Sequence, residues 1–236
     1  MDFQRFPHTP HLAWLGPGKP RADKVLSPQE ISHLLAGEVT IEEKVDGANL
    51  GLSVDEAGDL RVQNRGEYLQ RGAHPQFQPL WPWLDVRRSA LTEALGQSLI
   101  LFGEWCFAVH SVHYRDLPDW FLGFDVYDRR ERRFWSSSRR DVLFARLPLL
   151  PVPRLAQGHF DMPQLLEMLN EPSRLGADAL EGIYLRRENN LWLEDRAKLV
   201  RAEFNQAIEE HWSMRRLQKN QLAHQDPLLR RPSRAG

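Results

Sequence analysis

The sequence predicts a mixed α+β domain in which antiparallel sheets are flanked by helices. Three observations support this fold class. Runs rich in apolar and aromatic residues, bounded by Gly, Asp and Asn, are typical of strands. Ser and Asp at N-capping positions precede segments of helical period. The runs 180–187 and 191–201 are joined by Glu188-Asn189-Asn190, which predicts a hairpin, and no repeat or linker divides the chain into two domains.

The first helix is expected to begin after an irregular N-terminal arm, residues 1–26. This arm is rich in Pro, Gly and His, yet it carries apolar side chains that need a packing partner. Ser27, Pro28 and Glu30 fit the N-cap, N1 and N3 positions of a capping box, with proline where its missing N–H does no harm. Gly37 is expected to end this helix.

The remaining elements follow from the same signals. Strands are expected over residues 38–45, 49–55, 60–65, 98–107, 120–127, 134–135, 180–187 and 191–201. Further helices are expected over 80–95 with a break near its start at Pro82, from a Ser137 or Ser138 cap to Leu147, from Asp161, and through Phe204, Ile208 and Trp212. Connections without regular structure are expected over 66–77, 108–119 and 148–158. The domain is expected to span 27–224, followed by a loose basic tail over 225–236.

Composition favours a soluble protein of the cytoplasm. The single cysteine, Cys106, rules out an internal disulfide and fits a reducing compartment. The N-terminus lacks the apolar core of a signal peptide, and no apolar run approaches the roughly 20 residues that a membrane helix needs. We therefore expect no membrane association.

The stretch Glu43-Lys44-Val45-Asp46-Gly47-Ala48-Asn49 lies between two predicted strands. A lysine at a strand end beside an acid and a glycine fits a covalent nucleophile, whereas Asp-Gly also fits a charged hairpin turn. Lysine usage favours the nucleophile. Only five of the 31 basic residues are lysine, with none between Lys44 and Lys198, and lysine can lose its proton where arginine cannot.

Several predicted strands carry charged residues where a purely structural strand would place apolar ones. Buried charges are costly unless they are paired, so these side chains are expected to converge on one cleft. They are Arg65, Glu104, Asp125, Glu181, Arg196 and Lys198.

In this order, the motifs resemble the covalent nucleotidyltransferase superfamily, which comprises ATP- and NAD-dependent polynucleotide ligases and capping guanylyltransferases. The matching stretches are Lys44-Val45-Asp46-Gly47, Arg65-Gly66, Phe102-Gly103-Glu104, Phe124-Asp125-Val126-Tyr127, Glu181-Gly182-Ile183 and Lys198-Leu199-Val200-Arg201. Within the superfamily, the chain is most similar to small ATP-dependent RNA ligases of the nick-sealing phage type, in which Asn often follows the nucleophile as Asn49 does here.

The resemblance implies ATP and Mg²⁺ or Mn²⁺ as cofactors, and RNA with 5′-phosphate and 3′-hydroxyl ends as the partner. Lys44 would attack the α-phosphate of ATP, and Mg²⁺, Arg65 and Lys198 would lower its pKa by disfavouring the charged form. Glu104 would bind the ribose, and Phe124 would stack on adenine, although its periodicity alone equally fits a core residue. The implied nucleotide-binding residues are Glu43, Asp46, Asn49, Arg65, Glu104, Phe124, Arg196 and Lys198, and the implied metal ligands are Glu181 and Asp46.

Two departures from the family pattern narrow the prediction. Arg196 stands where these ligases often have a lysine, which leaves its role open. About 38 residues follow Lys198, too few for the OB-fold of DNA ligases and capping enzymes, so no C-terminal OB-fold is expected. The sequence does not indicate whether a partner supplies such a domain in trans.

The rival hypothesis for the function is a non-catalytic module that binds nucleotides or RNA ends.

An arginine cluster between 129 and 140 fits either RNA binding or a solvated face. Its members are Arg129, Arg130, Arg132, Arg133, Arg139 and Arg140.

Overall fold

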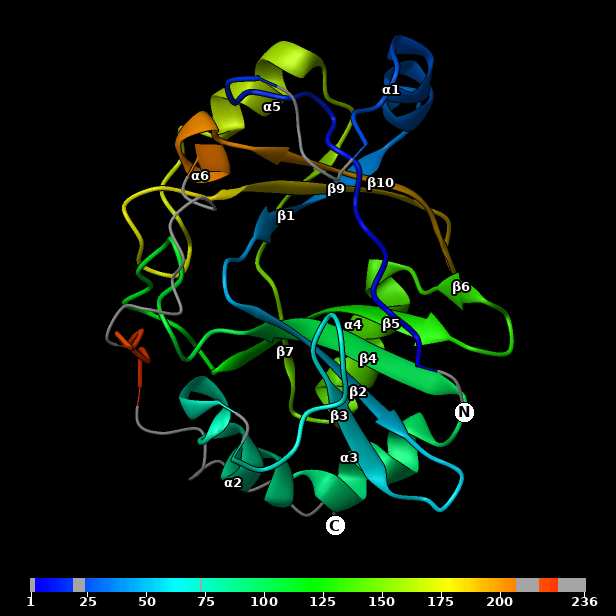
Figure 1. Cartoon of the computed structure of the whole chain (residues 1–236). Coiled ribbons are helices and arrows are strands. Elements are labelled where there is room, and N and C mark those ends of the chain that lie inside the picture. The colour runs from blue at the N-terminus through cyan, green and yellow to red at the C-terminus, as the bar shows by residue number, and fades with distance from the viewer. Residues whose placement is uncertain (1–2, 19–23, 73, 207–216, 225–236) are drawn as a thin grey trace.

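Two antiparallel sheets form the centre of the fold, with helices on their outer faces (Figure 1). The computed structural model describes residues 3–18, 24–72, 74–206 and 217–224. The four-stranded sheet has the order β10-β9-β1-β8, and the larger sheet has the order β3-β2-β4-β5-β6 with β7 added parallel to β5. The mixed α+β prediction is confirmed.

The strands are β1 (Val39–Lys44), β2 (Ala48–Val54), β3 (Leu60–Gln63), β4 (Leu99–Trp105), β5 (Phe121–Asp128), β6 (Arg133–Phe134), β7 (Leu150–Pro151), β8 (Arg154–Gly158), β9 (Gly182–Glu188) and β10 (Leu193–Val200). The helices are α1 (Pro28–Leu35), α2 (Leu80–Asp85), α3 (Arg88–Leu95), α4 (Ser137–Arg146), α5 (Met162–Met168) and α6 (Ala202–Gln206), with a 3₁₀ turn at Pro75–Phe77. None of the helices in the described part of the chain is long and apolar enough to cross a membrane.

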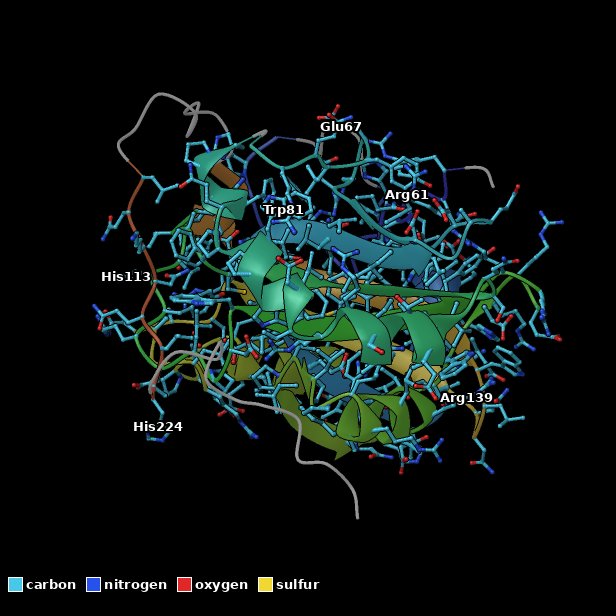
Figure 2. The ribbon with its side chains drawn as sticks, turned by 90° about the horizontal axis from the view of Figure 1, so that it is seen from below. Arg61, Glu67, Trp81, His113, Arg139 and His224 are labelled. Carbon is cyan, nitrogen blue, oxygen red and sulfur yellow. The ribbon has the colours of Figure 1, made fainter. Side chains whose placement is uncertain are left out.

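Each sheet has its own hydrophobic core on the side away from the other sheet. Helices α1 and α5 cover the four-stranded sheet, where Leu34 and Leu165 are buried with Ile41 of β1. Helices α2 and α3 cover the larger sheet, where Trp83 and Leu91 are buried with Leu101 of β4. Figure 2 shows these two helices in front of that sheet, with Trp81 of α2 labelled. The inner faces of both sheets are therefore free to carry polar side chains.

Local signals predicted several helix and strand ends correctly. Ser27 and Glu30 form both halves of the capping box at α1, and Asp161 forms a second capping box at α5. The predicted hairpin is β9 and β10, and the strands expected at β1 to β5 lie within one or two residues of their predicted bounds. The proposed tail lies outside the described residues, as do Ile208 and Trp212 of the last predicted helix.

Three local predictions are wrong. The break in the 80–95 helix falls between Asp85 and Arg88, because Pro82 lies in the first turn of α2, where backbone N–H groups have no partner within the helix. Helix α4 is capped by Ser136, because the hydroxyl of Ser137 donates instead to Glu188. The region 148–158, expected as a connection, contains β7 and β8, and β8 pairs with β1.

The N-terminal arm packs against both sheets. Gln63 of β3 donates a hydrogen bond from Nε2 to the carbonyl of Gln4 at 2.9 Å, and the Leu12 N–H donates to the carbonyl of Lys198 in β10 at 2.7 Å. Phe6 is buried between these two points. In Figure 1, the dark blue arm runs from the four-stranded sheet down to the larger sheet. The arm therefore closes one side of the space between the sheets.

A buried network of charges joins the two sheets across this space. Nη1 of Arg186 in β9 lies 2.7 Å from Asp125 in β5 and 3.7 Å from Glu42 in β1. Glu42 also pairs with Arg140 of α4 at 2.7 Å. All four side chains are at most 1% exposed. Both arginines donate to the Phe124 carbonyl, at 2.7 Å from Arg140 and 3.2 Å from Arg186, so the network also holds β5 at that point.

Replacing Arg186 with Met is expected to destabilise the protein strongly. Removing one partner of a buried ion pair leaves Asp125 charged and without its main counter-charge, which typically costs about 3–5 kcal/mol. The free energy of unfolding in urea measures this loss. Arg88→Met, at a 44% exposed side chain on α3, is the control and should change stability by about 0.5 kcal/mol or less. Equal stabilities for the two variants would show that the network does not hold the sheets together.

Candidate active site

Lys44 lies at the end of β1, where its side chain meets a carboxylate from the neighbouring strand. In the register of β1 and β9, Lys44 is opposite Gly182, and Nζ lies 2.5 Å from Oε1 of Glu181. A Cβ at Gly182 would lie 2.4 Å from the Leu199 carbonyl oxygen, so only glycine allows β10 to approach so closely here. The strand pairing thus places the Glu181 carboxylate beside the Lys44 amine.

The chain then turns from one sheet into the other. A Cβ at Gly47 would lie 2.7 Å from the carbonyl oxygen of Trp105, so this turn lies directly against β4. Strand β2 begins immediately afterwards, and its register with β4 pairs Asn49 with Glu104. The Asp-Gly turn and the lysine are therefore parts of the same feature, because the turn leads from Lys44 to a second set of polar side chains.

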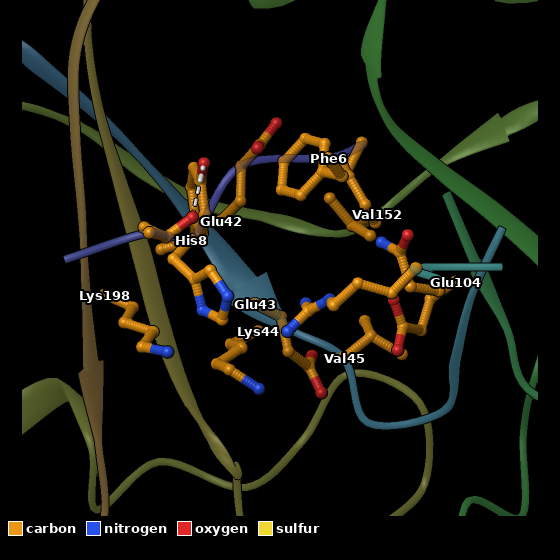
Figure 3. A pocket seen from close by; sticks show the side chains of 14 residues that line it. Phe6, His8, Glu42, Glu43, Lys44, Val45, Glu104, Val152 and Lys198 are labelled. Atoms are coloured by element: carbon orange, nitrogen blue, oxygen red, sulfur yellow. Dashed lines mark hydrogen bonds between the residues drawn. The ribbon is translucent and has the colours of Figure 1, made fainter. Parts of the chain in front are cut away.

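These side chains line a pocket between the sheets (Figure 3). In this view, Lys44, Lys198 and His8 lie to one side, and Phe6, Val152 and Glu104 lie to the other. The lining residues are Phe6, His8, Thr9, Glu42, Glu43, Lys44, Val45, Asn49, Arg65, Glu104, Phe124, Val152, Tyr184 and Lys198. The structure thus brings together seven of the predicted site residues: Glu43, Lys44, Asn49, Arg65, Glu104, Phe124 and Lys198.

Arg65 reaches the pocket from a preformed turn after β3. The side-chain oxygen of Asn64 accepts hydrogen bonds from the N–H groups of Gly66 at 2.7 Å and Glu67 at 2.8 Å. Such a turn fixes the backbone on both sides of Arg65. The Arg65 side chain itself is exposed, so it lies at the open side of the pocket.

The charges around Lys44 are mainly acidic. Burial disfavours the charged amine, but the carboxylates of Glu181 and Asp46, with a further contribution from Glu104, outweigh it, so the pKa of Lys44 lies above its ordinary value. The same burial raises the pKa of Glu104 to about 8, although Lys44 opposes this shift. The protein's own side chains therefore keep Lys44 protonated.

Two polar atoms beside the pocket are buried without a hydrogen-bond partner among the described residues: Oε2 of Glu181 and Oδ1 of Asn49. Unsatisfied buried oxygens are costly, and they suit a site that is completed by a ligand. The described residues contain no group of three or more His, Cys, Asp or Glu that could hold a metal alone. Mg²⁺ is commonly bound by one or two carboxylates together with substrate phosphates, which fits the open oxygen of Glu181.

Two of the predicted nucleotide-binding acids, Glu43 and Asp46, accept hydrogen bonds from loops of the protein. The Glu43 side chain accepts hydrogen bonds from the Ser173 hydroxyl at 2.5 Å and the Arg174 N–H at 3.0 Å. Successive residues of a strand point to opposite faces, so the Glu43 carboxylate is bonded on the other face of β1 from the Lys44 amine, although Glu43 still contributes to the pocket lining. Oδ2 of Asp46 accepts from the N–H groups of Ser111 and Val112 and so holds the 108–119 loop. This oxygen is occupied, although the charge of Asp46 still acts on Lys44.

Arg196, whose role the sequence leaves open, contacts two aromatic rings and a buried acid. It lies on the same strand face as Lys198, but its guanidinium group lies over the rings of Phe6 at 5.0 Å and Phe134 at 4.4 Å. It pairs with Asp125 at 3.3 Å, at the edge of the buried charge network. Arg196 is therefore placed to support the pocket wall and is absent from the pocket lining.

The arginine cluster divides into three groups. Arg140 is buried in the charge network and is withdrawn from the predicted RNA-binding set, because its fork is held by Glu42 and Asp141. Arg139 lies 3.7 Å over the Trp135 ring, and Arg133 lies 5.0 Å over Trp192. The remaining three arginines, Arg129, Arg130 and Arg132, belong to the turn between β5 and β6.

Sequence reasoning missed the contribution of the N-terminal arm to the pocket. Phe6, His8 and Thr9 all line it, and the Thr9 hydroxyl lies 3.4 Å from the hydroxyl of Tyr184. The Phe6 ring packs edge-on against Phe124 with centroids 5.1 Å apart. The apolar residues of the arm indicated that it must pack somewhere, but no local pattern indicated where.

Comparison with known proteins places the chain in a family. A family model described as RNA ligase matches residues 37–200. This match covers more than half of the 236 residues, and the chain belongs to the RNA ligase family. No curated protein matches the chain.

Solved structures with a similar fold include the RNA ligase of Naegleria gruberi. Its structure with PPi is 20% identical, with a TM-score of 0.60 over 73% of this chain and 52% of that chain. A variant of it with ATP and Mn is 16% identical, with a TM-score of 0.61 over 86% of this chain and 57% of that chain. A further variant with AMP and Mn is 16% identical, with a TM-score of 0.60 and the same coverage. At these identities the likeness shows the fold, and the chain spans about half the length of these ligases.

Glu104→Gln is expected to change how stability depends on pH. Glu104 has an ordinary pKa near 4.5 when the chain is unfolded and about 8 when it is folded, so the folded protein holds one more proton between these values. Stability should therefore fall as pH rises through this window, by at most about 1.4 kcal/mol per pH unit from this group. The Gln variant lacks this loss.

The measurement is the free energy of unfolding between pH 5 and pH 8, without nucleotide or divalent metal. Glu93→Gln, at an exposed position of α3, is the matched control and should follow the wild type. Parallel curves for wild type and Glu104→Gln would contradict the burial of this carboxyl group.

Proposed function

We propose that this protein is an ATP-dependent RNA ligase that works through a covalent lysyl-AMP intermediate on Lys44. The observation that carries the proposal is the pocket itself. It places the only lysine of β1 beside Glu181 and across from Glu104 and Phe124, in a chain of the RNA ligase family. The Naegleria gruberi structures with ATP and Mn, with AMP and Mn, and with PPi support ATP, a divalent metal and pyrophosphate as the ligands of this fold.

In the first step, neutral Lys44 Nζ attacks the α-phosphorus of ATP. A P–N bond forms, the P–O bond to the β-phosphate breaks, and pyrophosphate leaves. The amine must first release a proton, and the Glu181 carboxylate, which already contacts Nζ, is the nearest acceptor. Glu104 would bind the ribose hydroxyls and Phe124 would stack on the adenine, as the motif resemblance implies.

Lys44 needs a change in its surroundings before it can react. The carboxylates that surround it favour its charged form in the protein alone. A divalent ion at Glu181, when bound with the nucleotide, would neutralise this acid and the phosphates and so lower the pKa of Lys44. Oε2 of Glu181 is the atom available to hold it, and Asp46 would contribute mainly through its charge.

The next two steps consume RNA ends. An oxygen of the 5′-phosphate attacks the lysyl-AMP phosphorus, the P–N bond breaks, and Lys44 regains its amine. The 3′-hydroxyl then attacks the 5′-phosphate, a phosphodiester forms, and AMP leaves. Lys198 and Arg65 would neutralise phosphate charge through these steps, because both line the pocket with Lys44.

A location in the cytoplasm stays a prediction of the sequence.

Incubation with α-labelled ATP and Mg²⁺ or Mn²⁺, followed by denaturing electrophoresis, tests the proposal. The wild type is expected to retain an acid-labile label, as a phosphoramidate should, and Lys44→Ala should retain none. Lys24→Ala, at an exposed lysine, is the matched control and should label like the wild type. Labelling by GTP in place of ATP would indicate a capping enzyme. ATP binding without any covalent label would indicate a nucleotide-binding module and overturn the proposal.

A further inference from the structure

A second hollow lies at the turn between β5 and β6, next to Gln4 of the N-terminal arm. It is open to solvent and is lined by Gln4, Gln97, Ser98, Tyr127, Arg129, Arg130 and Arg132. Three arginines, two amides and two hydroxyl groups therefore surround it, and no lining residue is acidic. Guanidinium, amide and hydroxyl groups are the donors that proteins use to bind phosphate oxygens.

The turn that presents these arginines is held by hydrogen bonds. Oδ1 of Asp128 accepts from the N–H groups of Arg130 at 3.0 Å and Glu131 at 3.2 Å. Arg132 has a φ of 55°, a left-handed conformation that is unfavourable for a residue with a side chain. Strained residues of this kind cluster at functional sites. The backbone thus holds Arg130 and Arg132 in place before any ligand binds.

Arg129 is fixed on the same wall. Its N–H donates to the Ser98 carbonyl at 2.8 Å, and Nη1 donates to the Gln97 carbonyl at 3.1 Å. Burial lowers the pKa of this guanidinium group, which a bound anion would offset.

The charges of Arg130 and Arg132 are available to a ligand. Both side chains are exposed, and neither forms an ion pair with the residues that the structure describes. By contrast, Arg140 and Arg186 are paired with carboxylates. The only acid on the turn itself with an exposed side chain is Glu131. The turn therefore carries a net positive charge directed at an open, polar hollow.

The hollow is close to the pocket. Gln4 lines the hollow and Phe6 lines the pocket, and two residues of extended chain span at most about 7 Å. Ring contacts connect the same two places: Tyr127 lies 4.9 Å from Phe134, which lies 5.7 Å from Phe6. In Figure 1, β6 and the N-terminal end of the arm lie on the same side of the larger sheet. One strand of nucleic acid can therefore reach both.

We propose that this hollow binds backbone phosphates of the RNA strand whose end is joined in the pocket. The proposal rests on the proposed function for the identity of the strand. Arg130 and Arg132 contact the phosphates, and Arg129 with Gln97 and Ser98 forms the wall behind them. Because these contacts are to phosphates, they give affinity and register without reading the base sequence.

The test is the salt dependence of RNA binding by the double variant Arg130→Gln/Arg132→Gln. Each phosphate contact on a single strand contributes about 0.7 to the slope of log K against log salt, so the slope should fall by up to about 1.4. Fluorescence anisotropy with a 5′-phosphorylated RNA oligonucleotide measures it. With a DNA oligonucleotide of the same sequence, the slope should fall by the same amount, since RNA and DNA both present backbone phosphates. Labelling by ATP should remain at the wild-type level, because neither arginine lines the pocket.

Arg88→Gln/Arg146→Gln removes the same charge from exposed positions on α3 and α4 and should keep the wild-type slope. An unchanged slope in the hollow variant, or an equal fall in the control variant, overturns the proposal. The two proposals fail separately. Absence of covalent label in the wild type contradicts the ligase, whereas an unchanged salt slope contradicts only the phosphate site.

Discussion

The buried pairing of Arg186 with Asp125 and Glu42 is the constraint on which the cleft depends. These charges come from both sheets, and isolated in a protein interior each would be strongly destabilising. Together they limit the distance between the sheets, since Nη1 of Arg186 must reach Asp125 of the larger sheet while it stays near Glu42 of its own sheet. The Phe124 carbonyl accepts hydrogen bonds from Arg186 and Arg140, so the ring expected to face the nucleotide sits on backbone that this network holds. Stability and the shape of the pocket therefore share one cause.

The sequence predicts most of the site because its residues are tied to strand ends. Lys44, Glu104 and Lys198 each lie in or at the end of a strand, next to a motif of fixed spacing, and all three line one pocket. Glu43 lines the same pocket, but its carboxylate is bonded to Ser173 and Arg174. Neither charge nor spacing in the sequence shows this, because the faces of a strand alternate and the bonded loop is distant in sequence. The contact of Asp46 could not be predicted either, since only the fold brings the 108–119 loop to its carboxylate.

Long-range packing explains what the sequence could not provide. The N-terminal arm has no periodic pattern, yet Phe6 completes the pocket because rings from β4, β5 and β6 surround it. Strand β8 is short and half-exposed. It forms because it pairs with β1, and its residues alone do not strongly favour a strand. The arginine cluster looked uniform in sequence, but the structure separates the buried Arg140 from the exposed Arg130. Burial is a property of the whole fold, so adjacent residues of one type can serve different purposes.

In the proposed mechanism AMP becomes attached to Nζ of Lys44, although the charges of the protein alone favour the protonated amine. Tandem mass spectrometry of peptides from protein incubated with ATP and Mg²⁺, digested at neutral pH to preserve the phosphoramidate, tests this claim most directly. We expect one AMP, on Lys44, in the peptide that contains Glu43 and Asp46. AMP on Lys198 in its place, or bound ATP with no AMP adduct on any residue, would contradict it.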